Sequence, residues 1–232
     1  LISGGTFEGP VTNDADCTIS GGKFQSTVTS EGYLEDGTFN GDVTLNNGGV
    51  TGGVFKGTVN NKASYVAGGT FNGNVINDFL LAGGTYHGTV TNTAKGKIDK
   101  GTFLGDVTNN GQINGGTYKG NVINNAVLAD GTYKGKVTNN GQINGGAFSG
   151  AITGTGTIAA DAVKLTITFN SNGGSGAMGT MTVAYGETVI FPENGFTAPE
   201  GKRFVRWAID SPDGNTTSLP GGGLTIFQGT TA

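Results

Sequence analysis

The chain has 232 residues, of which 46 are glycine and only 13% are charged. This glycine content is about three times the average, but the chain has no collagen period, and its regularly placed Phe and Val residues are not typical of a flexible linker. The net charge of -4 argues against nucleic acid as a partner, and without a run of about 20 apolar residues no membrane span is expected.

The first two thirds of the chain repeat a unit of 15 to 17 residues ten times. In every unit an aromatic residue follows an aliphatic residue by five positions and precedes a Val or Ile by four. Glycine lies two positions before every aromatic residue and two positions after it in all units but one, where Ser26 replaces it. The aromatic positions are Phe7, Phe24, Phe39, Phe55, Phe71, Tyr86, Phe103, Tyr118, Tyr133 and Phe148.

This unit predicts a strand that carries the aromatic residue, the glycine after it and the Val on one inward face, because side chains alternate along a strand. The aliphatic residue is out of phase, so we expect the chain to turn at the glycine before the aromatic. One unit cannot bury its own aromatic ring, whereas ten units stacked at the strand spacing of ~4.8 Å form a continuous core about 45 to 50 Å long. We therefore predict an all-β or mainly β chain, with a parallel β-solenoid at residues 1–158 and the ten aromatic residues as its core ladder.

Three inward positions in each unit predict a small triangular or flattened cross-section. The sequence leaves the handedness open. The segment "NNGQINGG" recurs after 30 residues, so a coil of two units stays possible. Hairpin turns at the Gly-Gly steps would instead give an antiparallel ribbon, which would leave ten aromatic residues uncovered.

Asparagine recurs six residues after the aromatic position, and this column predicts a structural ladder of side-chain amides at a second corner of the coil. Sugar recognition by these amides is the alternative. The column consists of Asn13, Asn61, Asn77, Asn92, Asn109, Asn124 and Asn139.

Threonine often lies one residue before the aromatic position and five residues after it, as at Thr6 and Thr12. Threonine arrays on a flat solenoid are used in ice binding. Here, however, charged and polar residues such as Glu8, Lys56 and His87 lie between the two columns, so solvent-facing β-propensity explains the threonines better.

The repeats offer few residues for catalysis or metal binding. Asp42 and Asp106 share a column but lie four coils apart, roughly 19 Å by strand spacing, which is too far for an acid and base pair. His87 is isolated, Cys17 has no second thiol for a disulfide or a zinc site, and Asp14–Cys17 lacks the pattern of a calcium-binding loop. We expect no catalytic, metal-binding or cofactor-binding residues.

The repeat ends near Ile158, and residues 159–164 form a short connection to a second domain at residues 165–232. This second part contains the only Trp and both Arg residues. Its core is predicted to include Trp207, Phe169, Phe191 and Phe204. Strand patterns lie at residues 165–169, 181–185, 188–191, 204–209 and 224–227.

The second part resembles a known family. The segments "ITFNSNGGSGAM", "VAYGETV" and "FTAPEGKRFVRW", followed by "LTIFQGTTA", are similar in kind and order to the Listeria-Bacteroides repeat, the internalin B-repeat type of module. The resemblance implies a β-grasp-like fold, a bacterial cell-wall setting and a spacer or adhesive role without catalytic residues. Lys202 and Arg203 depart from the family pattern. Members usually continue beyond the point where this chain stops, so we expect a truncated domain. The "GGTFxGxVxN" array is similar to repeats in large surface proteins of gut bacteria.

These observations lead to the expectation of a non-catalytic, extracellular fragment of a bacterial surface protein. It would be a rod-like adhesin or presentation module that contacts a glycan or a host protein, and the sequence leaves its oligomeric state open. One alternative is a solenoid carbohydrate-active enzyme, a lyase or hydrolase, or an inactive relative of one. Another is a purely structural stalk.

Overall fold

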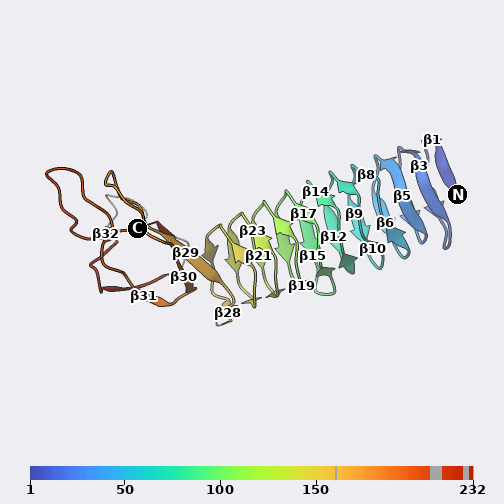
Figure 1. The fold of residues 1–232 in the computed structure, drawn as a ribbon. Coiled ribbons are helices and arrows are strands. Elements are labelled where there is room, and N and C mark those ends of the chain that lie inside the picture. The colour runs from blue at the N-terminus through green and yellow to red at the C-terminus, as the bar shows by residue number, and fades with distance from the viewer. Residues whose placement is uncertain (160, 210–215, 227–229, 232) are drawn as a thin grey trace. The chain divides into compact units, whose positions relative to one another are not determined.

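In the computed structural model, residues 1–159, 161–209, 216–226 and 230–231 are described. The chain divides into unit 1, Leu1–Thr157, and unit 2, Ile158–Ala232. The described residues form strands and turns, without a helix that could cross a membrane. Unit 1 is a stack of β-coils that begins at β1 (Figure 1). The predicted parallel β-solenoid is therefore confirmed.

Two parallel sheets build unit 1. The 10-stranded sheet contains one strand from each coil. Its strands are β2 (Val11–Asn13), β4 (Val28–Ser30), β6 (Val43–Leu45), β9 (Val59–Asn61), β12 (Val75–Asn77), β15 (Val90–Asn92), β18 (Val107–Asn109), β21 (Val122–Asn124), β24 (Val137–Asn139) and β27 (Ile152–Thr153).

The 18-stranded sheet carries both the aliphatic and the aromatic positions. Its strands are β1 (Ile2–Phe7), β3 (Thr18–Phe24), β5 (Tyr33–Phe39), β7 (Gly49–Val50), β8 (Val54–Phe55), β10 (Tyr65–Val66), β11 (Thr70–Phe71), β13 (Leu80–Leu81), β14 (Thr85–Tyr86), β16 (Lys97–Ile98), β17 (Thr102–Phe103), β19 (Gln112–Ile113), β20 (Thr117–Tyr118), β22 (Val127–Leu128), β23 (Thr132–Tyr133), β25 (Gln142–Ile143), β26 (Ala147–Phe148) and β28 (Thr157–Ile158).

One coil is one repeat unit. Each strand pairs in parallel with the equivalent strand of the next unit, so that Phe55 lies beside Phe71 and Val59 beside Val75. This register excludes both a coil made of two units and an antiparallel ribbon for unit 1. The ladder continues to Ile158, because β28 still pairs with β25.

The glycine before each aromatic residue has a positive φ in every unit, for example 107° at Gly116. An L-residue rarely adopts this conformation. The predicted corner between the aliphatic and aromatic residues is absent from the first three coils, because β1, β3 and β5 each carry both positions in one strand, with register shifts around Ser20. In these coils the glycine forms a bulge-like step. From the fourth coil onward two short strands, such as β7 and β8, lie on either side of the glycine step, as predicted. In both forms the aliphatic and the aromatic side chain point into the core.

The glycine after the aromatic residue does not face the core as predicted. Gly57 and Gly73 lie in the turn between the two sheets, and a Cβ on Gly73 would collide with the backbone of Gly57 in the preceding coil. Glycine is required at this turn because two backbones approach closely. The aromatic residue and the Val therefore point into the core from different sheets.

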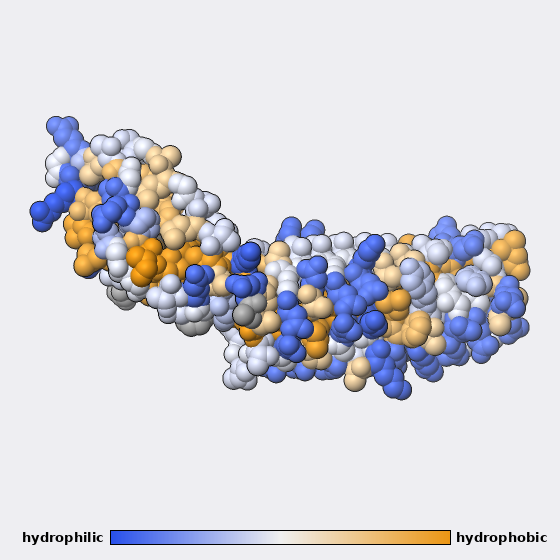
Figure 2. Space-filling model, turned by 60° about the horizontal axis from the view of Figure 1, so that its bottom comes forward, coloured by the Kyte–Doolittle hydropathy of each residue, from blue (hydrophilic) through white to orange (hydrophobic). Residues whose placement is uncertain are grey.

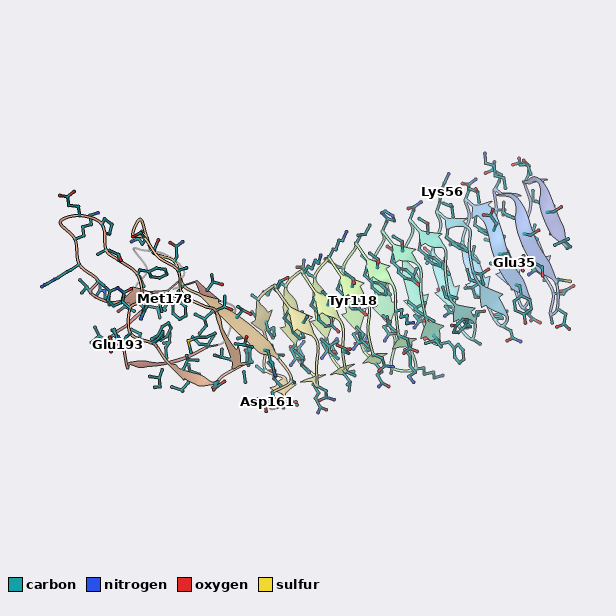
Figure 3. The ribbon with its side chains drawn as sticks, viewed as in Figure 1. Glu35, Lys56, Tyr118, Asp161, Met178 and Glu193 are labelled. Carbon is teal, nitrogen blue, oxygen red and sulfur yellow. The ribbon has the colours of Figure 1, made fainter. Side chains whose placement is uncertain are left out.

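The core of unit 1 consists of the aliphatic, aromatic and Val columns. Eight aromatic rings from Phe24 to Tyr133 are buried, while Phe7 and Phe148 in the first and last coils are half-buried. The interior of the coil is thus filled by side chains. Tyr118 lies inside its coil, and Lys56 extends outward from a turn (Figure 3).

Unit 2 contains three small sheets. The described strands are β29 (Lys164–Thr168), β30 (Met181–Ala184), β31 (Thr188–Ile190), β32 (Trp207–Ala208), β33 (Thr217–Ser218), β34 (Gly223–Thr225) and β35 (Thr230–Thr231). β29 pairs antiparallel with β30 and parallel with β35, and the pairs β31–β34 and β32–β33 are antiparallel.

The predicted strands of unit 2 are found with different bounds, most of them shorter. Residues 204–209 give only β32, whereas β33 and β35 were not predicted, and Phe227 lies outside the described residues. β29 already begins at Lys164, within the predicted connection, and Val163 just before it is buried. The β-grasp arrangement stays a prediction.

The core of unit 2 gathers around Trp207. Its ring lies 4.9 Å from those of Phe169 and Phe204 between centroids, and Phe169 meets Phe191 edge to face at 6.4 Å. Trp207 donates a hydrogen bond from Nε1 to the carbonyl of Pro192 at 3.0 Å. Three of the four predicted rings are buried, and Phe204 is half-buried.

Candidate functional site

The aromatic column is a continuous stack inside the solenoid. Neighbouring rings lie 4.7 to 5.0 Å apart between centroids and are nearly parallel from Phe7 to Phe148. This separation equals the strand spacing, so the parallel register itself places one ring over the next. Because the rings are enclosed, this column stabilises the rod and presents no platform for a ligand.

Three tyrosines take part in the stack, and their hydroxyl groups form hydrogen bonds with the backbone of their own coil. Tyr86, Tyr118 and Tyr133 each donate a hydrogen bond to the backbone carbonyl three residues earlier, at 2.7, 2.8 and 2.9 Å. Burial raises the pKa of all three phenols far above the ordinary value. These groups remain neutral donors at physiological pH.

The predicted asparagine ladder lies on the inner face of the 10-stranded sheet. Each amide from Asn61 to Asn124 donates a hydrogen bond from Nδ2 to Oδ1 of the asparagine in the next coil, at 2.8 Å in every case, and Asn139 donates to the carbonyl of Thr157. All six side chains are at most 2% exposed. The amides also donate to backbone carbonyls of the turn, such as Asn92 to Gly96. Enclosed and saturated amides of this kind are structural and cannot contact a sugar.

The first coils depart from this ladder. Asn13 donates to the hydroxyl of Ser30 at 3.0 Å, and Leu45 occupies the asparagine position of the next coil. Both replacements are buried. The column therefore accepts a small polar residue or an apolar residue of similar size.

A second polar column lies at the turn between the sheets and was missed by the sequence reasoning. The carboxylate Oδ1 of Asp42 accepts the backbone N–H of Thr58 in the next coil, and Oδ1 of Asp106 accepts that of Asn121, both at 2.8 Å. Asn74 and Asn121 make the same contact to Thr89 and Lys136. The two carboxylates, four coils apart, thus serve as equivalent acceptors in a repeated turn.

The two threonine columns lie on different sheets. Thr6 belongs to the 18-stranded sheet, whereas Thr12 is the central, outward residue of β2 in the other sheet. The surface seen in Figure 2 is largely hydrophilic along unit 1, with smaller hydrophobic areas between. The exposed asparagines Asn110, Asn125 and Asn140 form an outer ladder at 2.9 and 3.0 Å.

The remaining candidates are isolated. His87 and Cys17 are exposed, and Cys17 is a free thiol. Within the described part of the chain, no three His, Cys, Asp or Glu side chains gather as a metal site would require.

Exposed rings mark one place on the outside of unit 1. Tyr33 and Tyr65 are 50% and 49% exposed, and Phe79 is 46% exposed. They lie at variable positions of the unit, which the repeat pattern does not mark. Tyr33 and Tyr65 each precede the aliphatic residue of their unit, and the register places them in one column of the 18-stranded sheet, with Gly49 between them.

Comparison of the chain with protein-family models, with curated proteins and with solved structures finds no match. A function for this chain is therefore inferred from the geometry of unit 1.

Proposed function

We propose that this chain is part of a bacterial extracellular surface protein in which unit 1 acts as a non-catalytic, rod-like binding and presentation module. The observation that carries the proposal is the contrast between the inward and the outward positions of each coil. The buried columns are occupied by stacked rings, aliphatic side chains and saturated amides, whereas the outward columns repeat polar side chains at each coil. A rigid rod with repeated surface groups is suited to many weak contacts with an extended partner.

The two acidic residues that share a column, Asp42 and Asp106, support binding rather than hydrolysis. Hydrolysis of a glycosidic bond by the usual mechanism needs two carboxyl groups within about 10 Å. Asp42 and Asp106 lie about 19 Å apart, four strand spacings along the column. Each carboxylate is also engaged with the backbone of the next coil.

The extracellular setting rests on the resemblance of unit 2 to the Listeria-Bacteroides repeat. In that setting unit 2 would serve as a spacer or adhesive module next to unit 1. The partner of the rod would be a glycan or a host protein.

Binding of the complete chain to an array of glycans and extracellular host proteins tests the proposal. We expect reproducible, weak binding that strengthens when several copies are displayed on one particle. A purely structural stalk predicts no binding in either format. Release of new reducing ends or unsaturated sugars from any polysaccharide on the array would instead establish the enzymatic alternative.

A further inference from the structure

An aromatic strip lies on the outer face of the 18-stranded sheet, formed by Tyr33, Gly49 and Tyr65. Gly49 pairs with Tyr33 on one side and with Tyr65 on the other, so the backbones of the two tyrosines are two strands apart, about 10 Å along the rod. Leu80 follows Tyr65 in the same column, and the exposed Phe79 lies in the turn before it, outside the strand. The column runs parallel to the solenoid axis.

Gly49 makes room for the ring of Tyr33. Gly49 is buried although its column faces outward, and a Cβ placed on it would lie 3.5 and 3.7 Å from Cδ1 and Cε1 of Tyr33. The ring thus leans over the backbone of Gly49, which covers part of it and leaves half of the residue exposed. Unlike the glycine before each aromatic residue, Gly49 does not have a positive φ. The backbone conformation at this position therefore does not require glycine.

The surroundings of the strip are polar. Glu31 and Glu35 lie on either side of Tyr33 in the chain, Thr51 follows Gly49, and Lys62 precedes Tyr65; all four are exposed. Glu35 projects from the surface of its coil (Figure 3). These side chains can exchange hydrogen bonds with hydroxyl groups, and the two carboxylates beside Tyr33 disfavour an acidic ligand.

We propose that this strip binds a neutral, extended polysaccharide chain, laid along the rod. The inference rests on the proposed binding function and names its ligand class. Tyrosine presents a flat apolar ring with a polar tip, which complements the apolar face and the hydroxyl rim of a pyranose ring. Because the Tyr33 ring leans over Gly49 toward Tyr65, the strip offers its aromatic surface to one stretch of a sugar chain that lies along the rod.

A protein partner fits this strip less well. A stable protein interface covers about 800 Å² on each side and has an apolar centre. Here two half-exposed tyrosines are set among charged and polar side chains. Such a narrow surface is sufficient for single sugar rings, which need a flat contact and nearby hydrogen-bonding groups.

Titration of the complete chain with cellohexaose, xylohexaose, mannohexaose and chitohexaose tests the proposal, with an acidic oligogalacturonate of the same length for comparison. We expect at least one neutral hexasaccharide to bind and the acidic one to bind more weakly. Tyr33→Ala and Tyr65→Ala should each reduce the affinity about tenfold. Ile76→Ala, which removes an exposed apolar side chain from the other sheet, is the matched control and should leave the affinity unchanged.

Gly49→Thr offers a sharper test because both tyrosines stay in place. The new side chain meets neighbours at ordinary contact distances at Cβ and should push the Tyr33 ring away from the backbone. We expect affinity to fall about tenfold while the melting temperature does not decrease. Circular dichroism of the same sample shows whether the variant is still folded. It therefore distinguishes a lost contact with the ligand from a fall in affinity caused by unfolding.

The inference is overturned if none of the neutral hexasaccharides binds, or if a chain carrying both Tyr33→Ala and Tyr65→Ala binds as well as the wild type. In either case binding of the wild type to a host protein or another glycan on the array would leave the proposed function standing. Absence of every interaction would remove both.

Discussion

Asn61 donates a hydrogen bond to Oδ1 of Asn77 at 2.8 Å, and neither side chain is accessible to solvent by more than 1%. Asn77 in turn donates to Asn92. Each buried amide therefore satisfies its neighbours in the coils before and after it, and no described buried side-chain nitrogen or oxygen lacks a hydrogen-bond partner. Removal of one amide disturbs two others.

Asn92→Ala should lower the free energy of unfolding of unit 1 by about 2 to 4 kcal/mol, because it leaves a cavity and removes the partner of Asn77 and of Asn109. Urea denaturation followed by circular dichroism measures this change. Asn125→Ala, in the exposed outer ladder, is the matched control and should change stability by less than about 0.5 kcal/mol. Equal effects of the two substitutions would contradict a structural role specific to the buried ladder.

Gly116→Val should destabilise unit 1 by at least about 2 kcal/mol. Its φ of 107° is unfavourable for a β-branched residue, and its Cβ would lie 3.1 Å from the hydroxyl of Tyr118. Gly49→Ala serves as the control, since Gly49 lacks a positive φ. Thermal unfolding that is unchanged in Gly116→Val would refute the requirement for glycine between β19 and β20.

High pH should destabilise unit 1 through its buried tyrosines. Burial raises the pKa of Tyr86, Tyr118 and Tyr133 above the ordinary value of 10.0, so above pH 10 the unfolded chain loses phenolic protons that the folded chain retains. Stability is therefore complete below pH 10 and falls as the pH rises further, by up to about 4 kcal/mol per pH unit for three groups.

The triple variant with Phe at these three positions should lose this part of the pH dependence. Denaturation curves recorded from pH 8 to 11 compare the two proteins. A parallel decline in both would show that other groups cause it. At neutral pH the variant should be less stable by about 1 kcal/mol per lost hydrogen bond.

Asp106→Asn should leave the stability of unit 1 within about 0.5 kcal/mol, because Asn121 in the same column makes the same contact with an amide oxygen. Asp106→Ala removes the acceptor and should cost about 1 kcal/mol. The difference between the melting temperatures of the two variants measures how much the hydrogen-bond acceptor at this position contributes to stability. A large loss in Asp106→Asn would indicate a role for the charge itself.

The single tryptophan of the chain lies in unit 2, so its fluorescence reports the unfolding of unit 2 separately. Phe169→Ala removes a ring that contacts Trp207, and it should shift the unfolding transition seen by tryptophan fluorescence to lower temperature. The loss expected for a buried Phe is about 3 to 5 kcal/mol. The β-sheet signal of unit 1, followed by circular dichroism, should keep its own transition. A common shift of both signals would show that the two units unfold together.

The repeat pattern predicted the solenoid well because a strict spacing of aromatic, aliphatic and glycine residues leaves few arrangements that bury ten rings. It misplaced the glycine after the aromatic residue. Gly57 looks like part of an alternating strand, but it is required by the backbone of a neighbouring coil, and such a contact between distant residues is not visible in local spacing.

The candidate binding strip could not be predicted for a related reason. Tyr33 and Tyr65 occupy a position where the other units carry Gly, Leu, Lys, Gln, Thr or Val, so it has no repeated signal. The contact of the Tyr33 ring with Gly49 appears only in the structure. In unit 2, β33 and β35 have two residues each, which is too short for alternation to reveal a strand.

The buried asparagine ladder also gives the rod a direction. Every amide between Asn61 and Asn139 points its N–H toward the following coil, and the reverse sense would require all of them to flip together. Their dipoles therefore add along the axis instead of cancelling, and hydrogen bonds aligned in this way polarise one another. Apart from its surface charges, unit 1 has an electrically distinct head and tail, so a partner that lies along it can distinguish the two orientations.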